Sequence, residues 1–132
     1  MKVIGLNNRE YTLSFSNNES GRASALHKKV RSFLKEIFPL TRIYEEIHLP
    51  GCPTRLYLDF FIPAYKIGIE CQGSQHDEYN QFFHKNRLGF TKSLKRDRHK
   101  SEFCELNGIV LLSFYEDENE ELWKKAISNM GN

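Results

Sequence analysis

The order of its helical and strand patterns predicts that this 132-residue chain is an α/β protein, a mixed β-sheet flanked by helices. An amphipathic helical segment precedes three short apolar segments, and a second helix, a strand and a last helix follow. Ten Phe, six Tyr and one Trp can build a hydrophobic core, which excludes wholesale disorder. No apolar run approaches the roughly 20 residues of a membrane span, so we expect no integral membrane protein.

The N-terminal part predicts a β-hairpin and a helix. The hairpin strands are expected over Lys2–Ile4 and Glu10–Phe15, on either side of a turn. The stretch from Asn17 to Ser20 is rich in N-cap residues, and apolar residues at helical spacing predict a helix from Arg22 to Phe38. Pro39 then ends this helix.

Three strands are expected next, over Ile43–Leu49, Leu56–Ile62 and Ile67–Gln72. Alternation along the second strand places one set of apolar side chains on a single face: Leu56, Leu58, Phe60 and Ile62. On the third strand, Glu70 and Gln72 share the face opposite Cys71. We interpret the run from Gly73 to Arg87 as a loop with some helix.

The C-terminal part predicts a helix, a strand and a final helix. Phe90, Leu94, Phe103 and Leu106 mark the first of these helices, which ends at Asn107-Gly108 in a left-handed cap. A buried strand over Ile109–Phe114 and a short helix over Glu120–Met130 follow. We therefore expect a single domain in three parts, an N-terminal hairpin at 1–16, a core at 20–114 and a C-terminal helix at 115–132.

Several classes of function are disfavoured by what the sequence lacks. Three cysteines without a CxxC pair argue against a disulfide scaffold and a zinc site. With no secretory signal visible, we expect an intracellular protein. P-loop, GxGxxG and GxSxG motifs are absent, which removes the commonest nucleotide-binding and hydrolase interpretations.

Two acids in neighbouring strands are the main candidates for chemistry. Asp59 lies in an otherwise hydrophobic strand, and Glu70 lies in the strand after the next turn. Opposed residues of antiparallel strands have Cβ atoms about 5 Å apart, and two buried carboxylates at that distance need a cation. With the backbone carbonyl of Cys71, they predict an oxygen site for Mg²⁺ or Mn²⁺. The alternative is an exposed sheet face on which both acids meet water.

The second helix and the preceding loop supply further candidates. At 100° per residue, Asp97 and Lys100 fall on the apolar stripe of the helix, where charges are usually paired or functional. The alternative is an intrahelical ion pair between them. His76 follows the acidic strand and is a candidate general base or phosphate contact, although a loop histidine is often only solvated.

Positive charge is concentrated in the middle of a chain whose net charge is only +2. Between His84 and Lys100 the only acid is Asp97, against seven basic residues: Lys85, Arg87, Lys92, Lys95, Arg96, Arg98 and Lys100. This pattern predicts a surface that binds a polyanion. A solvated helix with lysines for solubility is the alternative.

Taken together, these residues resemble the core of the PD-(D/E)xK nuclease superfamily over nearly half the chain. The matching segments are Leu56–Phe60, Ile69–His76, Lys95–Lys100 and Cys104–Ile109, a D…ExQGxQH…RDxxK string. The likeness is greatest to the very-short-patch-repair endonuclease branch, with small phage and intron-associated homing endonucleases. It implies a restriction-endonuclease-like core.

The chain departs from the family motif at Gln72, where a lysine is usual. The resemblance implies that either Lys100 or His76 takes over its role. The family often adds an acid from the first helix, and Glu19, Glu45 and Glu46 are the candidates here.

The function implied by the resemblance is a Mg²⁺-dependent endodeoxyribonuclease, for which Mn²⁺ substitutes. Asp59, Glu70 and the Cys71 carbonyl would hold the metal, with Gln72, His76, Asp97 and Lys100 as further catalytic residues. Double-stranded DNA would bind along the basic segment, and a double-strand break would require a homodimer or two successive nicks. A homing role would place the protein in the cytoplasm of a bacterial or phage-infected cell. The alternatives are a junction-resolving or mismatch-nicking nuclease, or an inactive DNA-binding relative.

Overall fold

The computed structural model describes residues 1–15, 19–21, 23–73 and 87–130, with the backbone alone over 87–94. Its elements follow in the order β1 (Lys2–Ile4), β2 (Glu10–Thr12), α1 (Ala25–Ile37), β3 (Tyr44–Leu49), β4 (Leu56–Ile62), β5 (Ile67–Gln72), α3 (Arg87–Leu106), β6 (Val110–Tyr115) and α4 (Glu120–Ser128). The α/β class is as predicted, and the bounds of β4 and β5 are those expected from the sequence.

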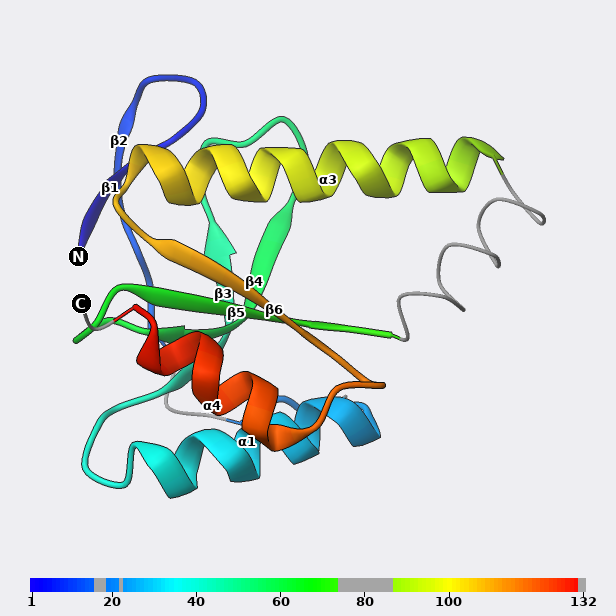
Figure 1. Cartoon of the computed structure of the whole chain (residues 1–132). Coiled ribbons are helices and arrows are strands. Elements are labelled where there is room, and N and C mark those ends of the chain that lie inside the picture. Colours follow the sequence, from blue (N-terminus) through cyan, green and yellow to red (C-terminus); the bar gives the residue numbers. More distant parts are fainter. Residues whose placement is uncertain (16–18, 22, 74–86, 131–132) are drawn as a thin grey trace.

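The main sheet is mixed and has the strand order β3-β4-β5-β6 (Figure 1). The first three strands form an antiparallel meander, and β6 pairs parallel to β5. A parallel neighbour requires a crossover, which α3 supplies on its way from one end of the sheet to the other. β1 and β2 form a separate antiparallel hairpin.

Helices cover both faces of the sheet (Figure 1). On one face, Phe103 and Cys104 of α3 pack with Leu58 of β4 and with the N-terminal hairpin. On the other face, α1 and α4 pack in a second core, where Phe33 and Trp123 are almost fully buried. The sheet is therefore apolar on both faces, so a charged residue on β4 or β5 is an exception.

Helix α1 begins later than expected. Its N-cap is Ser24, whose hydroxyl accepts a hydrogen bond from the His27 N–H at 3.1 Å. The predicted cap at 17–20 and the helix start at 22 are wrong, although residues 17, 18 and 22 lie outside the described part. Several residues that can cap a helix follow one another here. Ser24 is the one that does so, because the apolar face of the helix begins directly after it. The helix ends before Pro39, as predicted.

Strand β4 does not keep one apolar face, which corrects the predicted alternation. Leu56 and Leu58 lie in the α3-side core, whereas Phe60 and Ile62 lie in the core beneath α1 and α4. The change of face occurs at Asp59. The residue facing it on β3 is Glu46, which has a left-handed backbone with φ of 50°. The β3–β4 pairs on either side of this point have the same register. The side chains of both strands therefore change from one face of the sheet to the other here.

The C-terminal elements agree with the sequence apart from small shifts. Gly108 follows α3 with φ of 67°, the left-handed cap that was expected. β6 is an edge strand rather than a fully buried one, since Val110 at its start is exposed. The loop expected over 73–87 lies outside the described residues except at its ends, and Arg87 already belongs to α3. None of the helices in the described part is long and apolar enough to cross a membrane.

Candidate functional site

Asp59 and Glu70 face each other where the β4–β5 ladder stops. The paired residues run from Ile62↔Ile67 to Phe60↔Ile69, so Asp59 and Glu70 would form the next pair. Side-chain hydrogen bonds continue the ladder instead. The Asp59 N–H donates to Glu70 Oε2 at 3.2 Å, and the Cys71 N–H donates to Asp59 Oδ2 at 2.8 Å. Two carboxylates therefore occupy an opening between the strands.

Lys100 of α3 completes this group. Its ammonium donates to Glu70 Oε1, and its side chain is largely buried. Glu70 itself is buried, with 4% of its surface exposed, and Asp59 is half-buried. Burial raises the pKa of Glu70 to about 8, and the nearby Asp59 adds to the rise while Lys100 opposes it. The pair of acids is thus poised to take up positive charge.

Cys71 contributes its backbone to the same opening. Gln72 bonds toward β6, where its carbonyl accepts from the Glu116 N–H at 3.1 Å. The N–H and C=O of one strand residue point to the same side of the strand, and neighbouring residues alternate. Since the Cys71 N–H reaches Asp59, its carbonyl also faces β4. The Cys71 thiol packs against the core beneath α1 and α4, where burial raises the pKa of the thiol well above its usual range.

The other candidate catalytic residues differ in where they lie. Gln72 is half-buried and, two residues after Glu70 on β5, points to the same face of the sheet. His76 lies outside the described residues. Asp97 is exposed, so its predicted place on the buried side of the helix is wrong. The buried face of α3 is centred between Phe103 and Cys104. Lys100 lies roughly 10° from that centre, whereas Asp97 lies roughly 70° from it.

The predicted basic surface is described only in part. Lys95, Arg96 and Arg98 are exposed on α3. Lys85 and the side chains of Arg87 and Lys92 lie outside the described part. Arg98 lies about 200° around the helix from Lys100 and is 3.8 Å from Glu102. The exposed basic side chains of α3 thus point in different directions.

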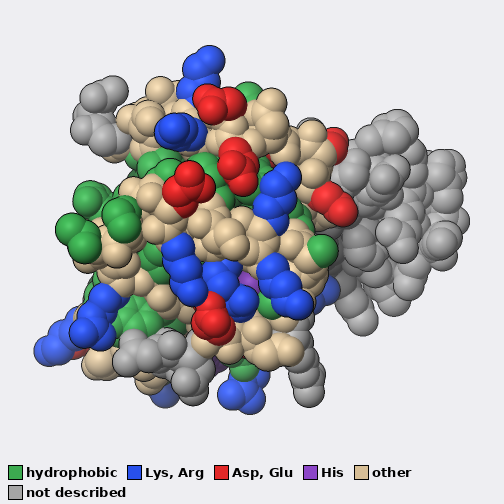
Figure 2. Space-filling view, turned by 90° about the horizontal axis from the view of Figure 1, so that it is seen from below, with side chains coloured by type: hydrophobic (Ala, Val, Ile, Leu, Met, Phe, Trp, Pro, Cys, Tyr) green, Lys and Arg blue, Asp and Glu red, His purple; other side chains and the backbone are tan. Residues whose placement is uncertain are grey.

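Basic side chains also gather on the opposite side of the molecule. Figure 2 shows the side of α1 and α4, where Lys and Arg side chains lie at several places with Asp and Glu side chains between them. α1 contains four basic residues: Lys28, Lys29, Arg31 and Lys35. Positive charge is therefore not confined to α3.

A buried ionic group beneath the sheet was missed by sequence reasoning. The Glu45 carboxylate, exposed by only 8%, accepts two hydrogen bonds from Arg31, at 2.7 and 2.8 Å. Its Oε1 lies 2.7 Å from His27 Nε2 and accepts from the Ser20 N–H at 3.1 Å. The i, i+4 spacing of His27 and Arg31 on α1 was the available signal.

The electrostatics of this group make it structural. Burial alone would raise the pKa of Glu45, but the hydrogen bonds from Arg31, Ser20 and His27 outweigh it and hold the pKa at about 2. Its oxygens are already occupied by these partners. Of the three acids considered for the first helix and strand, Glu45 is thus engaged, Glu19 is exposed beside Lys35 and Arg31, and Glu46 accepts from the Ser20 hydroxyl.

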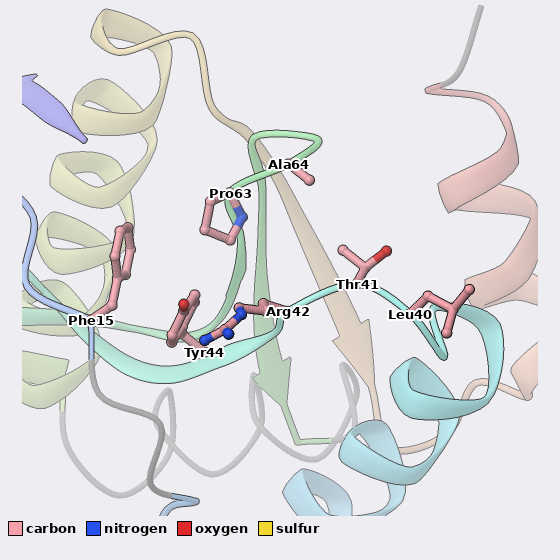
Figure 3. A pocket seen from close by; sticks show the side chains of 7 residues that line it. All are labelled: Phe15, Leu40, Thr41, Arg42, Tyr44, Pro63 and Ala64. Atoms are coloured by element: carbon pink, nitrogen blue, oxygen red, sulfur yellow. The ribbon is translucent and has the colours of Figure 1, made fainter.

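An aromatic hollow lies at the N-terminal end of β3. Its volume is about 390 Å³, and Figure 3 shows Phe15, Tyr44 and Pro63 around it. Phe15 and Tyr44 stack with ring centroids 4.7 Å apart. Arg42 is the one charged side chain among the described lining residues, so the hollow lacks the paired ionisable groups of the Asp59 site.

Comparisons with known proteins identify relatives without a described function. No family model matches the chain, and no solved structure matches it. It is 39% identical over 63 residues to uncharacterized protein 033L of Invertebrate iridescent virus 3, covering 48% of this chain and 32% of that protein. It is 39% identical over 64 residues to uncharacterized protein 094L of Frog virus 3, covering 48% and 41%.

A third relative is uncharacterized protein 307L of Invertebrate iridescent virus 6, which is 35% identical over 57 residues, or 43% of this chain and 29% of that protein. The matched segments span about a third of the length of these relatives. Over about half its length, the chain is therefore similar to parts of longer viral proteins.

Proposed function

We propose that the chain is a metal-dependent DNA endonuclease whose site is built on Asp59, Glu70 and Lys100. One observation carries the proposal. Two carboxylates face each other across an opened strand pair, and a lysine from a separate helix contacts one of them. Bringing two acids and a lysine together at a sheet opening is costly unless the charges serve a ligand.

The topology supports this proposal. A helix, an antiparallel meander of three strands, a crossover helix and a strand parallel to the third resemble the core of restriction-endonuclease-like proteins. The segments that carry the resemblance contain Asp59 and Glu70, which lie on the second and third strands of this sheet. The fit with the D…ExQ string suggested by the sequence is the second reason for the proposal.

The donor atoms fit Mg²⁺ or Mn²⁺. Asp59, Glu70 and the Cys71 carbonyl offer oxygen alone, the ligand type that these ions prefer. The described residues contain no cluster of three or more His, Cys, Asp or Glu that would form a protein-only cage. This agrees with Mg²⁺, which binds through one or two carboxylates and keeps water and substrate phosphate as its other ligands. Such a metal would polarise the scissile phosphate and lower the pKa of its bound water.

The remaining residues take separate roles. Lys100 holds positive charge at Glu70 before the metal binds and then neutralises charge that develops on the phosphate. The Gln72 amide, on the same sheet face as Glu70, orients the attacking water. The position of Lys100 on Glu70 supports the view that the family lysine has been replaced from the helix. His76 stays a candidate for the general base.

One observation favours a second candidate, a DNA-binding protein without catalysis. The neutral Gln72 stands where the related nucleases have lysine. Such a protein would retain the fold and bind DNA in EDTA as well as in Mg²⁺. Metal-dependent cleavage separates the two.

A plasmid assay tests the proposal. Supercoiled DNA incubated with the protein should be nicked or linearised in Mg²⁺ and in Mn²⁺ but not in EDTA. Asp59→Asn should abolish cleavage, whereas the control Glu105→Gln removes an exposed acid of α3 and should cut normally. Cleavage that persists in EDTA, or in purified Asp59→Asn, would overturn the assignment.

A further inference from the structure

A second pocket, whose described lining residues are all polar or charged, lies between α3 and the segment that leads into β4. It has a volume of about 470 Å³, and its lining residues are Thr54, Arg55, Lys95, Arg96 and His99. Three of these five described residues are cationic at neutral pH, and none is an acid. A hollow bordered by like charges is unfavourable when empty, and an anion relieves the repulsion.

The pocket adjoins the Asp59 site without sharing its residues. Arg96, His99 and Lys100 have the i, i+3, i+4 spacing of neighbours on one helical face. Lys100 contacts Glu70, so the next residues of this face place the pocket beside the proposed catalytic group. Arg55 enters from the β4 side, with its guanidinium carbon 5.9 Å from the centre of the Tyr57 ring.

His99 adds an independent observation. Its Nδ1 is buried and has no hydrogen-bond partner among the described residues. More than nine-tenths of buried polar groups in proteins have a partner, so an exception signals a water or a ligand that belongs there. This unpaired nitrogen belongs to a residue that lines the pocket beside the three cations.

We propose that this pocket binds a phosphate group of a nucleic-acid strand, next to the phosphate that is cut. The inference rests on the proposed function, because it takes DNA as the ligand. Arg55 and Arg96 can each bind a phosphate through two parallel N–H groups, and Lys95 adds a point charge. The volume lies within the roughly 300–1,000 Å³ of small-ligand sites, which leaves space for a sugar attached to the phosphate.

The phosphate has two sources, an internal phosphodiester or the terminal 5′-phosphate of a nick. Three fluorescent duplexes of one sequence distinguish them, an intact duplex with hydroxyl ends, a nicked duplex with a 5′-phosphate and a nicked duplex with a 5′-hydroxyl. Binding is measured by anisotropy in EDTA over a range of salt concentrations. Equal affinity for the three assigns an internal phosphodiester, and a preference for the 5′-phosphate assigns a terminal one.

Either source gives the same result for the variants. Arg55→Met and Arg96→Met should each weaken binding to the preferred duplex about tenfold, the effect of a lost charged hydrogen bond. Each should also make the slope of log K against log salt shallower by about 0.9. The control Lys124→Met removes the same charge from an exposed position on α4, on the other side of the sheet, and should change affinity less than about threefold.

Equal losses of affinity in Arg55→Met, Arg96→Met and the control Lys124→Met would overturn the proposed pocket, since charge alone would then account for binding. Unchanged binding in the first two would do the same. The assay contains no divalent metal, so its outcome is separate from that of the cleavage assay. If the wild type cleaves DNA but the three substitutions change the binding affinity equally, the nuclease proposal stands and the pocket proposal fails.

Discussion

The Glu70 carboxylate accepts a hydrogen bond from the Asp59 backbone N–H at 3.2 Å, at the point where the backbone pairing of their strands ends. Asp59 in turn accepts from the backbone of the residue after Glu70, at 2.8 Å. The two acids thus hold open the gap in which their own oxygens lie. Structure and proposed chemistry depend on the same atoms, so variants must be chosen to separate them.

Asp59→Asn keeps an oxygen that can accept from the Cys71 N–H, whereas Asp59→Ala leaves that N–H without its partner. A buried donor left unpaired costs about 1–3 kcal/mol. We therefore expect Asp59→Ala to be less stable than Asp59→Asn by about that amount in urea unfolding with EDTA. Equal stability of the two variants would show that the side-chain acceptor does not support the strands.

Lys100→Met should slow cleavage by roughly 10²–10³-fold, the loss that follows removal of one electrostatic group from a transition state. Lys100→Arg should recover part of this rate, because it restores the charge. The measurement is initial rate on plasmid at saturating Mg²⁺, with the exposed Lys124→Met as the matched control. If Lys100→Met cuts at the normal rate, another residue neutralises the charge on the phosphate, and His76 is the next residue to change.

Gln72 tests the departure from the nuclease motif that the sequence resembles. If its amide orients water, Gln72→Ala should lose roughly ten- to a thousandfold in cleavage rate, the range for one positioning hydrogen bond. Gln72→Lys introduces the lysine that is usual in that motif and should retain measurable cleavage. A wild-type rate in Gln72→Ala would remove this residue from the site.

The buried ionic group beneath the sheet predicts a pH dependence of stability. The pKa of Glu45 is about 2 in the folded protein, below the usual value of 4.5, so ionised Glu45 stabilises the fold above pH 4.5. That contribution is lost as pH falls toward 2. Arg31→Met should lower the free energy of unfolding by on the order of 3 kcal/mol at pH 7, because it breaks a buried ion pair.

The difference between wild type and Arg31→Met should then shrink as the pH falls from 4.5 to 2. Urea unfolding at several pH values measures it. Lys28→Met is the control, since Lys28 is an exposed cation of the same helix. A difference that stays constant down to pH 2 would show that the Glu45 charge does not contribute.

Local patterns predicted the elements well where each one depends on its own residues. β4 and β5 are bounded by turns rich in Pro and Gly, and their limits match the prediction. The change of face at Asp59 was not predictable, because it depends on the left-handed Glu46 of another strand. Sequence spacing placed Asp59 opposite Glu70, since strand register follows from the length of the turn between them.

The errors at the site have a similar cause. The stripe predicted from Phe90 and Leu94 includes Asp97. In the structure, Phe103 and Cys104 pack against the sheet, so the buried face of α3 is centred near Lys100 instead. The ion pairs of Glu45 join residues far apart in the sequence, from α1 and the segment before it to β3. The i, i+4 spacing of His27 and Arg31 is a local signal, but it does not identify Glu45 as their partner.

Binding of Mn²⁺ in the absence of DNA is the most direct test that Asp59 and Glu70 form a divalent-cation site. Isothermal titration calorimetry should show about one Mn²⁺ per chain for wild type and for Glu105→Gln. Asp59→Asn should bind at least about tenfold more weakly, because a neutral amide replaces a charged ligand. No Mn²⁺ binding by wild type, or equal binding by Asp59→Asn, would contradict the account.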